Sequence, residues 1–549
     1  MRTLPRLGPW LPLLIAACSS APWPAAPSTP PTSQQLGGAH LPITTRSAEA
    51  QELFDQGLAW CYAFHHDEAT RCFRAAVAAD PRCAMAHWGL AYAAGPHINN
   101  MAMSPAVAER AHADAQQARQ RAAGASPLER ALIDAIGARY ASPPPADRKE
   151  LDRAYANAMR KAYEDHGSQP DVAALFAESL MNLWPWDLWR HDGSPQPETP
   201  EILAVLEKIL ATHPRHPQGN HLYIHATEAS NQPERAVSAA PRLGALAPAA
   251  GHLVHMPSHV FLRVGRYEEA AEANRRAIVA DQATIARTGR AGFYEIYRAH
   301  NFHFLVYAAM FAGREQEAID AARALRTELP MAVVQQMPQF LEGFLGVPYE
   351  AMLRFGKWQE MLAEPEPPEW QKSTRALWHC GRGVAFAATG DVAKARQERD
   401  AYRAAVAAVP EDWTIGNNAT RTVLAIGDAF LDGEIEFRAG NRDAAFAALR
   451  LAVERNDALR YDEPWGWLMP PRHALGALLL EAGDAAASEA VYREDLRRNP
   501  DNGWALHGLA ECQQRQGKAS EALATQASFA RAWQHATVRI PASCFCRRP

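Results

Sequence analysis

The sequence predicts an all-α protein in which helical hairpins stack into a solenoid. Three observations lead to this prediction. The chain has 549 residues, which is more than one compact hydrophobic core usually supports. A pattern of glycine, aromatic, alanine and proline residues recurs at a fixed spacing. Apolar residues make up 48% of the chain and include many alanines, which suit close packing between helices.

The repeat is clearest in residues 50–83. This window carries, in order, Leu53, Gly57, Trp60, Ala69, Phe73, Ala76 and Pro81. Parts of the same pattern recur in five further windows, namely residues 217–250, 251–284, 299–332, 469–502 and 503–536. The pattern resembles the tetratricopeptide repeat, a unit of 34 residues made of two helices and a turn. The resemblance covers most of residues 46–536 and implies a right-handed superhelix of helical hairpins.

Breaks in the repeat divide the expected solenoid into two arrays. Residues 364–369 alternate glutamate with proline, which is typical of a loop or hinge. We therefore expect an N-terminal array over residues 46–363 and a C-terminal array over residues 370–536. Residues 537–549 then form a tail that contains Cys544 and Cys546. Two thiols one residue apart either close the C-terminal end as a disulfide or reduced pair, or bind a soft metal.

Three aromatic segments interrupt the repeats. Residues 184–189 and 461–467 are expected to pack against the edge of the solenoid, and the first is alternatively a wall or lid of a binding site. Residues 285–298 form an insertion that is a candidate to fold back over the groove. Insertions in solenoids collect on one face, often the binding face. Nothing in the C-terminal array points to chemistry.

Seven histidines occupy the same register in three consecutive repeat windows. Within each window they are three or four residues apart, which places them on one face of a helix. They are His221, His225, His252, His255, His259, His300 and His303. In tetratricopeptide repeats, the resemblance implies, this face of the first helix lines the concave groove. We expect Glu228, and Glu178 from the irregular region between the repeats, to lie on the same face.

This histidine pattern predicts a zinc or copper site. Imidazole is the most common metal ligand in proteins, and such ions need three or four donors around one point. All seven histidines are candidate ligands, and Glu178 and Glu228 are candidates for a carboxylate partner or a general base. None of the clusters has the His-Glu-x-x-His zinc signature. A groove that binds a peptide or anionic ligand, and a buried hydrogen-bond network, therefore remain as alternatives.

The favoured function is a binding scaffold that holds a protein or peptide partner in its concave groove and carries the metal site. The alternative is a metal-dependent enzyme, a hydrolase or an oxidoreductase, that uses the histidine-lined groove as its active site. The net charge of −5 and the lack of a basic stripe argue against a nucleic-acid partner.

The first residues read as a targeting signal. Arg2 and Arg6 precede a short apolar stretch, residues 10–17, which is too short to span a bilayer. Residues 15–18 resemble the bacterial lipobox, which implies cleavage before Cys18 and a lipid on that cysteine; the alternative is an ordinary secretory signal. We expect a signal over residues 1–17 and a Pro/Ser-rich tether over residues 18–45. These features predict a lipid-anchored protein of the bacterial cell envelope that faces the periplasm or the exterior.

Overall fold

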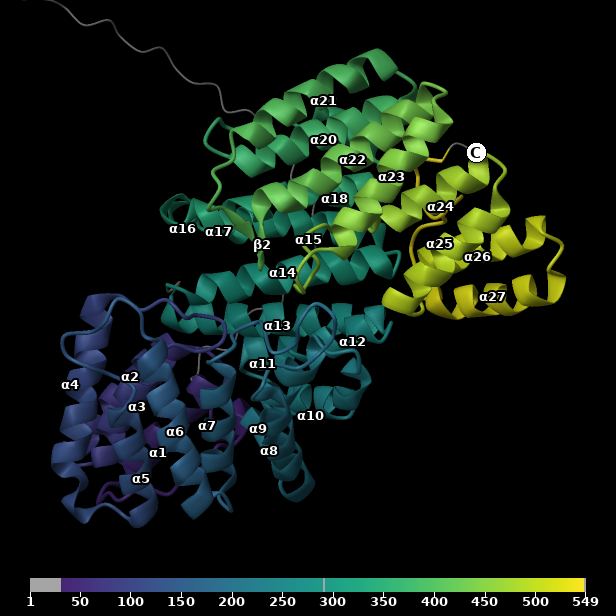
Figure 1. Cartoon of the computed structure of the whole chain (residues 1–549). Coiled ribbons are helices and arrows are strands. Elements are labelled where there is room, and N and C mark those ends of the chain that lie inside the picture. The colour runs from purple at the N-terminus through teal and green to yellow at the C-terminus, as the bar shows by residue number, and fades with distance from the viewer. Residues whose placement is uncertain (1–30, 290–291, 548–549) are drawn as a thin grey trace, which may run out of the picture.

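The computed structural model describes residues 31–289 and 292–547, and these are mainly helical (Figure 1). The predicted all-α fold, an array of helical hairpins, is confirmed. Among the described residues, no helix has the length and apolar character needed to cross a membrane. The predicted signal sequence and Cys18 lie outside the described residues.

The N-terminal helices stack side by side and are coloured purple to blue in Figure 1. They are preceded by the short 3₁₀ helix η1 (Ser33–Leu36). The helices are α1 (Ala48–Tyr62), α2 (His66–Ala79), α3 (Ala84–Ala94), α4 (Pro105–Arg121), α5 (Pro127–Gly137), α6 (Lys149–His166), α7 (Pro170–Met181), α8 (Thr199–Thr212) and α9 (Pro217–Glu228), with η2 (Ala122–Gly124) between α4 and α5. Consecutive helices contact one another throughout this part.

The middle of the chain, teal in Figure 1, connects the two ends of the molecule. Its elements are η3 (Pro233–Ala236), α10 (Ala239–Leu246), α11 (Gly251–His255), α12 (Pro257–Arg263), α13 (Tyr267–Thr288), α14 (Tyr294–Phe311), α15 (Glu315–Glu328), α16 (Met331–Gln336), α17 (Pro338–Leu341), η4 (Glu342–Gly346), α18 (Val347–Arg354) and α19 (Trp358–Ala363). Helices α13 and α14 include most of the predicted insertion at 285–298, so that much of this segment extends a helical hairpin.

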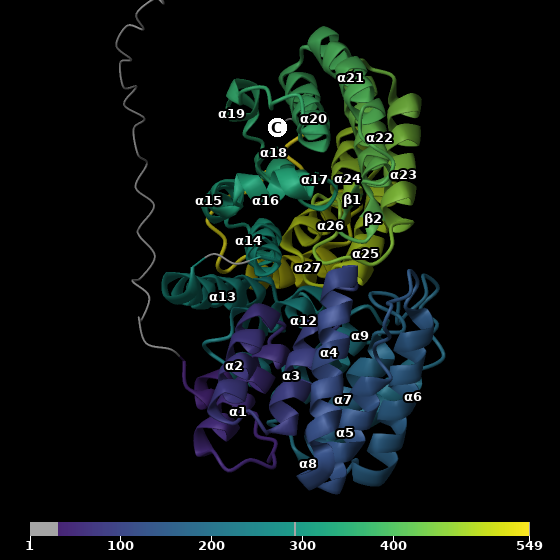
Figure 2. The same cartoon turned by 90° about the vertical axis from the view of Figure 1, so that its left-hand side faces the viewer.

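The last helices lie beside α14 and above the N-terminal helices in both views (Figures 1 and 2). They are α20 (Lys372–Thr389), α21 (Val392–Ala407), α22 (Thr420–Arg438), α23 (Arg442–Asp457), α24 (Pro471–Glu481), α25 (Ala485–Arg498), α26 (Gly503–Arg515) and α27 (Ala519–Ala532). Between α21 and α22, β1 (Thr414–Ile415) and β2 (Asn418–Ala419) form an antiparallel pair in which Thr414 faces Ala419.

Two prolines shape the helices that carry histidines. Pro217 is the first residue of α9, where a missing amide hydrogen costs nothing, and the His216 side chain accepts a hydrogen bond from the Gly219 amide (3.0 Å). Pro257 interrupts the next histidine helix and divides it into α11 and α12, because its nitrogen cannot donate to the preceding turn. His255 on the first piece and His259 on the second still lie together, with their Nε2 atoms 2.8 Å apart.

The start of the described chain differs from the predicted tether. Leu36 and Leu41 are each 1% exposed, and the Ala249 amide donates to the Gln35 carbonyl (3.1 Å). At least these residues of the 18–45 segment pack against the repeats, because apolar side chains at these positions find a buried surface between α1 and α10.

The two predicted arrays share helices at their junction. Residues 364–369 do form a loop, but Met352 and Met361, which precede it, belong to the apolar core of the C-terminal helices. Helix α18 contacts α14 and α15 on one side and α20 on the other. The C-terminal tail also packs back, since the Thr537 amide donates to the Gly313 carbonyl (3.0 Å).

The buried carboxyl group of Glu350, on α18, is expected to make the stability of the folded protein depend on pH. It is 6% exposed and accepts a hydrogen bond from the Leu468 amide (3.1 Å). Burial raises the pKa of Glu350 from 4.5 to about 8, against a smaller opposite effect of that hydrogen bond. The folded state therefore keeps a proton that the unfolded state releases, and stability is lost as the pH rises from the unfolded pKa through the folded one.

The variant Glu350→Gln keeps an acceptor oxygen and removes the charge. We expect it to raise the free energy of unfolding by roughly 2–4 kcal/mol at pH 9 and to change it little at pH 4. Urea unfolding at both pH values measures this difference, with Glu369→Gln as the control because that side chain is 91% exposed. Equal effects of Glu350→Gln at the two pH values would contradict the assignment.

Candidate metal centre

Six of the seven predicted histidines lie in one buried cluster, formed where α9, α11, α12 and α14 meet. We call this the histidine cluster. Its members are His221, His225, His252, His255, His259 and His300. They fall into two groups of three, and in each group one ligand atom from each histidine lies within 4.8 Å of the others. The repeat register therefore brings these side chains to one place.

The first group consists of His221, His225 and His252. The Nε2 atoms of His221 and His252 are 3.1 Å apart. The His221 Nδ1 lies 2.8 Å from the Tyr62 carbonyl, which can only accept, so Nδ1 carries the proton and the Nε2 lone pair faces the Nε2 of His252. The Nε2 of His225 has no hydrogen-bond partner among the described residues, although that side chain is only 2% exposed. The His225 Nε2 is therefore available to a ligand, and the Nε2 atoms of His221 and His252 face each other.

The second group consists of His255, His259 and His300. The Nε2 atoms of His255 and His259 are 2.8 Å apart. The His255 Nδ1 lies 2.6 Å from the Asn274 Oδ1. The side-chain amide nitrogen of Asn274 donates a hydrogen bond to the Ala270 carbonyl (2.8 Å). Asn274 therefore presents its oxygen to His255, which must donate from Nδ1 and keep its lone pair on Nε2.

Glu228 joins the two groups. Its Oε1 is 3.0 Å from the His225 Nδ1, and its Oε2 is 2.7 Å from the His259 Nδ1. One carboxylate thus contacts one histidine of each group through the nitrogen that faces away from the other histidines. Glu228 thus lies beside the histidines, in contact with two of the candidate ligands.

A second carboxylate comes from the C-terminal array. Glu463 contacts the His259 Nδ1 from the loop between α23 and α24, residues 458–470, and its side chain is 4% exposed. The sequence contains one indication of this contact, because two acidic residues follow Tyr461 in an aromatic loop and precede a proline. We expected only edge packing there, whereas Glu463 lies against a histidine of the cluster.

The electrostatics of the cluster favour the neutral form for four of its imidazoles and the charged form for one. Burial, reinforced by neighbouring histidines, holds the pKa of His221, His252, His255 and His300 well below 6.5. Burial also acts to lower the pKa of His259, but Glu463 and Glu228 outweigh it and raise that pKa to about 10. Neutral imidazole is the form that binds metals, so most of the cluster is ready to do so at neutral pH.

Two residues beside the cluster have strained backbones. Phe64 has φ 55° and Trp186 has φ 56°, and Asp501 is the only other residue besides glycine with a positive φ in the described chain. The Phe64 ring centre lies 4.5 Å from that of His221 and 5.3 Å from that of His252. The Trp186 ring centre lies 5.9 Å from that of His225. Strain of this kind is concentrated at functional sites.

Two predicted site residues lie apart from the cluster. Glu178 accepts a hydrogen bond from the Tyr92 hydroxyl, and burial raises its pKa. Among the described residues it belongs to none of the groups that can hold an ion. His303 packs against Phe344, with ring centres 5.1 Å apart, and among the described residues it too belongs to none of those groups.

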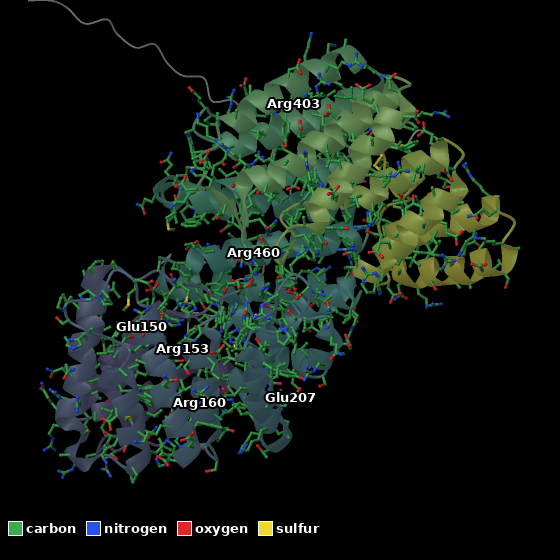
Figure 3. All side chains as sticks on the ribbon, in the orientation of Figure 1. Glu150, Arg153, Arg160, Glu207, Arg403 and Arg460 are labelled. Atoms are coloured by element: carbon green, nitrogen blue, oxygen red, sulfur yellow. A yellow bond between two sulfur atoms is a disulfide. The ribbon has the colours of Figure 1, made fainter. Side chains whose placement is uncertain are left out.

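A cleft of about 990 Å³ adjoins the cluster. Its walls include the 458–470 loop and residues 182–198, the loop between α7 and α8. Trp186, Ala229 and Tyr461 line both this cleft and a small cavity of about 20 Å³ that reaches His225 and Glu228. Residues of the 184–189 segment therefore line this cleft and the small cavity beside it. Arg460, labelled in Figure 3, lies on the cleft at the seam between the two parts of the molecule.

Comparison with solved structures returns other helical proteins at low identity. One is a human IFIT1 dimer with m7Gppp-AAAA, at 13% identity and a TM-score of 0.34, with 83% of this chain and 90% of that chain covered. Another is the APC/C hetero-tetramer Cut9-Hcn1, at 11% identity and a TM-score of 0.29, with 89% and 76% covered. No protein-family model and no curated protein matches the chain. The class of the protein, a solenoid of helical hairpins, follows from its own helices.

Phe64 provides a test of how tightly the cluster is packed. Its ring is 2% exposed and lies among His97, His221 and His252. We expect Phe64→Ala to lower the free energy of unfolding by about 3–5 kcal/mol, because the surrounding rings cannot collapse into the space. Chemical denaturation measures this loss. The control Phe340→Ala, at a position 51% exposed, should stay within about 0.5 kcal/mol of the parent protein; equal losses would show that the cluster is loosely packed.

Proposed function

We propose that this protein binds two transition-metal ions, zinc or copper, one in each group of three histidines. The observation that carries this proposal is the direction of the ring nitrogens. The His221 and His255 Nδ1 atoms are held by oxygen acceptors, and those of His225 and His259 face Glu228. Metal-binding histidines in proteins are oriented by such acceptors, which leave the other nitrogen free for the ion.

The spacing of the free nitrogens supports the proposal. Tetrahedral zinc with Zn–N bonds of about 2.0–2.1 Å holds its nitrogen ligands about 3.3 Å apart. The Nε2 pairs, 3.1 Å and 2.8 Å apart, are hydrogen-bonded in the structure, and they need only small movements to reach this separation once an ion replaces the shared proton. In each group, three imidazoles would leave one coordination position open, as in zinc sites that bind water or substrate.

Glu228 would couple the two sites. Its oxygens contact His225 and His259, which belong to different groups, so that one carboxylate would orient a ligand of each ion. A carboxylate in this position also makes the imidazole a stronger electron donor. Glu463 would reinforce the effect at His259 only.

We propose that the protein acts as a binding scaffold whose partner contacts the cleft. The six histidines are buried or nearly so, which leaves the cleft between the 182–198 and 458–470 loops as the accessible surface next to them. A protein or peptide segment is a suitable occupant, because arginine and aromatic side chains line the cleft together. Binding of candidate peptides to the metal-loaded protein and to Trp186→Ala tests this role.

The alternative function, a metal-dependent hydrolase or oxidoreductase, is favoured by one observation. The large cleft shares Trp186, Ala229 and Tyr461 with the small cavity at His225 and Glu228, so that a substrate in the cleft would lie close to an open metal position. Turnover of ester, peptide or oxidisable substrates that requires metal and is lost in His259→Ala would establish it. Turnover that persists in that variant would exclude this active site.

We also propose a location in the bacterial cell envelope, with a lipid on Cys18. Support comes from residues 2–18 alone, where two arginines, an apolar stretch and a lipobox-like end occur in order. Membrane fractionation of the full chain and of Cys18→Ser tests it. Release of the variant into the soluble fraction is the expected result, and membrane retention of the variant would overturn the lipid anchor.

The metal proposal makes a stoichiometric prediction. We expect the parent protein with its Cys544–Cys546 disulfide intact, after titration with zinc or copper and removal of excess ion, to hold two ions per chain by elemental mass spectrometry. Two triple alanine variants should each hold one ion; they replace His221, His225 and His252, and His255, His259 and His300, respectively. His303→Ala is the matched control, since it removes a buried histidine of α14 outside the cluster, and it should keep both ions.

Glu228→Gln tests the coupling separately. We expect it to weaken both sites by about 10–100-fold, because each site loses the carboxylate that orients one of its ligands. Weakening of one site alone would show that Glu228 serves a single ion. A folded parent protein that takes up no ion would reject the metal centre and leave the histidines as a buried hydrogen-bond network.

A further inference from the structure

We infer a second kind of metal site in the C-terminal array: Cys544 and Cys546, when reduced, bind a thiophilic divalent cation together with Glu434. One ligand atom from each of the three residues lies within 4.8 Å of the others, and all three side chains are buried. The site is formed by α22 and the C-terminal tail, and it shares no residue with the histidine cluster.

The tail is held firmly in the position that the site requires. The Ser543 hydroxyl donates to the His473 carbonyl (2.9 Å), and the Ser543 carbonyl accepts from Arg354 (3.3 Å). Arg547 pairs with Glu511 at 2.6 Å on the other side of the two cysteines. These contacts fix the residues on both sides of 544–546, and both sulfurs lie close to Glu434 on α22.

Glu434 is the observation that points to a cation. Its side chain is 0% exposed, and neither carboxylate oxygen has a hydrogen-bond partner among the described residues. Burial raises the pKa of Glu434 to about 7, although Arg438 acts in the opposite direction. A buried carboxyl group without a hydrogen bond is costly in a folded protein. A cation bound between this group and the two sulfurs would remove that cost.

The donor set selects the kind of ion. Two thiolates and one carboxylate oxygen are a combination that Zn²⁺ accepts, whereas Cu(I) prefers sulfur alone and Ca²⁺ or Mg²⁺ prefers oxygen. Three protein ligands leave a fourth position of the tetrahedron for water. Zinc is therefore the ion that we expect, and Co²⁺ can replace it as a spectroscopic probe.

The oxidation state of the cysteines controls the site. In the structure Cys544 and Cys546 form a disulfide, in which neither sulfur is a thiolate. An external dithiol breaks this bond by thiol–disulfide exchange: the dithiol is oxidised to its own disulfide, and the two protein sulfurs gain two electrons and two protons. Zinc then displaces the protons from the two thiols. Oxidation by the reverse reaction releases the ion.

The test is Co²⁺ binding to the full chain after reduction with a dithiol and removal of the reductant. Thiolate ligands give Co²⁺ a sulfur-to-metal charge-transfer absorption that histidine ligands do not give. We expect this band in the reduced parent protein and its loss after reoxidation. We also expect it to be lost in Cys544→Ser/Cys546→Ser and to need at least tenfold more Co²⁺ in Glu434→Gln.

Two controls make the outcome specific. Cys61→Ala/Cys72→Ala removes two other buried free thiols and should keep the band. The triple variant without His221, His225 and His252 should also keep it, so that failure of the histidine proposal and failure of this one can be told apart. Circular dichroism of each variant verifies folding. A reduced, folded parent protein without the band, or a band that survives in Cys544→Ser/Cys546→Ser, would overturn the proposal.

Discussion

The candidate metal centre depends on keeping one carboxylate, that of Glu228, charged inside the protein. A buried carboxylate is stable only if nearby groups replace the water that it has lost. His225 and His259 do so here, and they hold the pKa of Glu228 low despite the effect of burial. Glu463 adds a second carboxylate, and the proton on His259 and the guanidinium of Arg263 act on both. The positions of α9, α12 and the 458–470 loop are all constrained by this arrangement.

The same arrangement shows why the two arrays cannot be considered separately. Glu463 belongs to the C-terminal array by sequence but completes the environment of His259 in the N-terminal one. Helix α18 contributes to the packing on both sides, and the tail returns to Gly313. The loop at 364–369 is thus a turn within a continuous structure, because the apolar side chains before it find partners after it.

Local periodicity predicted the parts of the site that lie on neighbouring helices. His221 and His225 share a face because four residues make about one helical turn, and the repeat register then places His255 and His259 opposite them. The same reasoning failed for His303, which lies on the side of α14 that faces Phe344. The contact of Glu463 with His259 could not be predicted from the sequence for a different reason. Contacts between distant segments depend on how the whole array curves.

The closed position of the 458–470 loop has a kinetic consequence. Tyr461 lines the small cavity at His225, Glu463 contacts His259, and the side chains of these two histidines are only 2% and 1% exposed. An ion that entered during folding or during a brief opening of the loop would leave only when the loop opens again. Its residence time would be set by a conformational step rather than by the strength of its bonds to imidazole, and such an ion would survive dialysis that removes weakly enclosed ions.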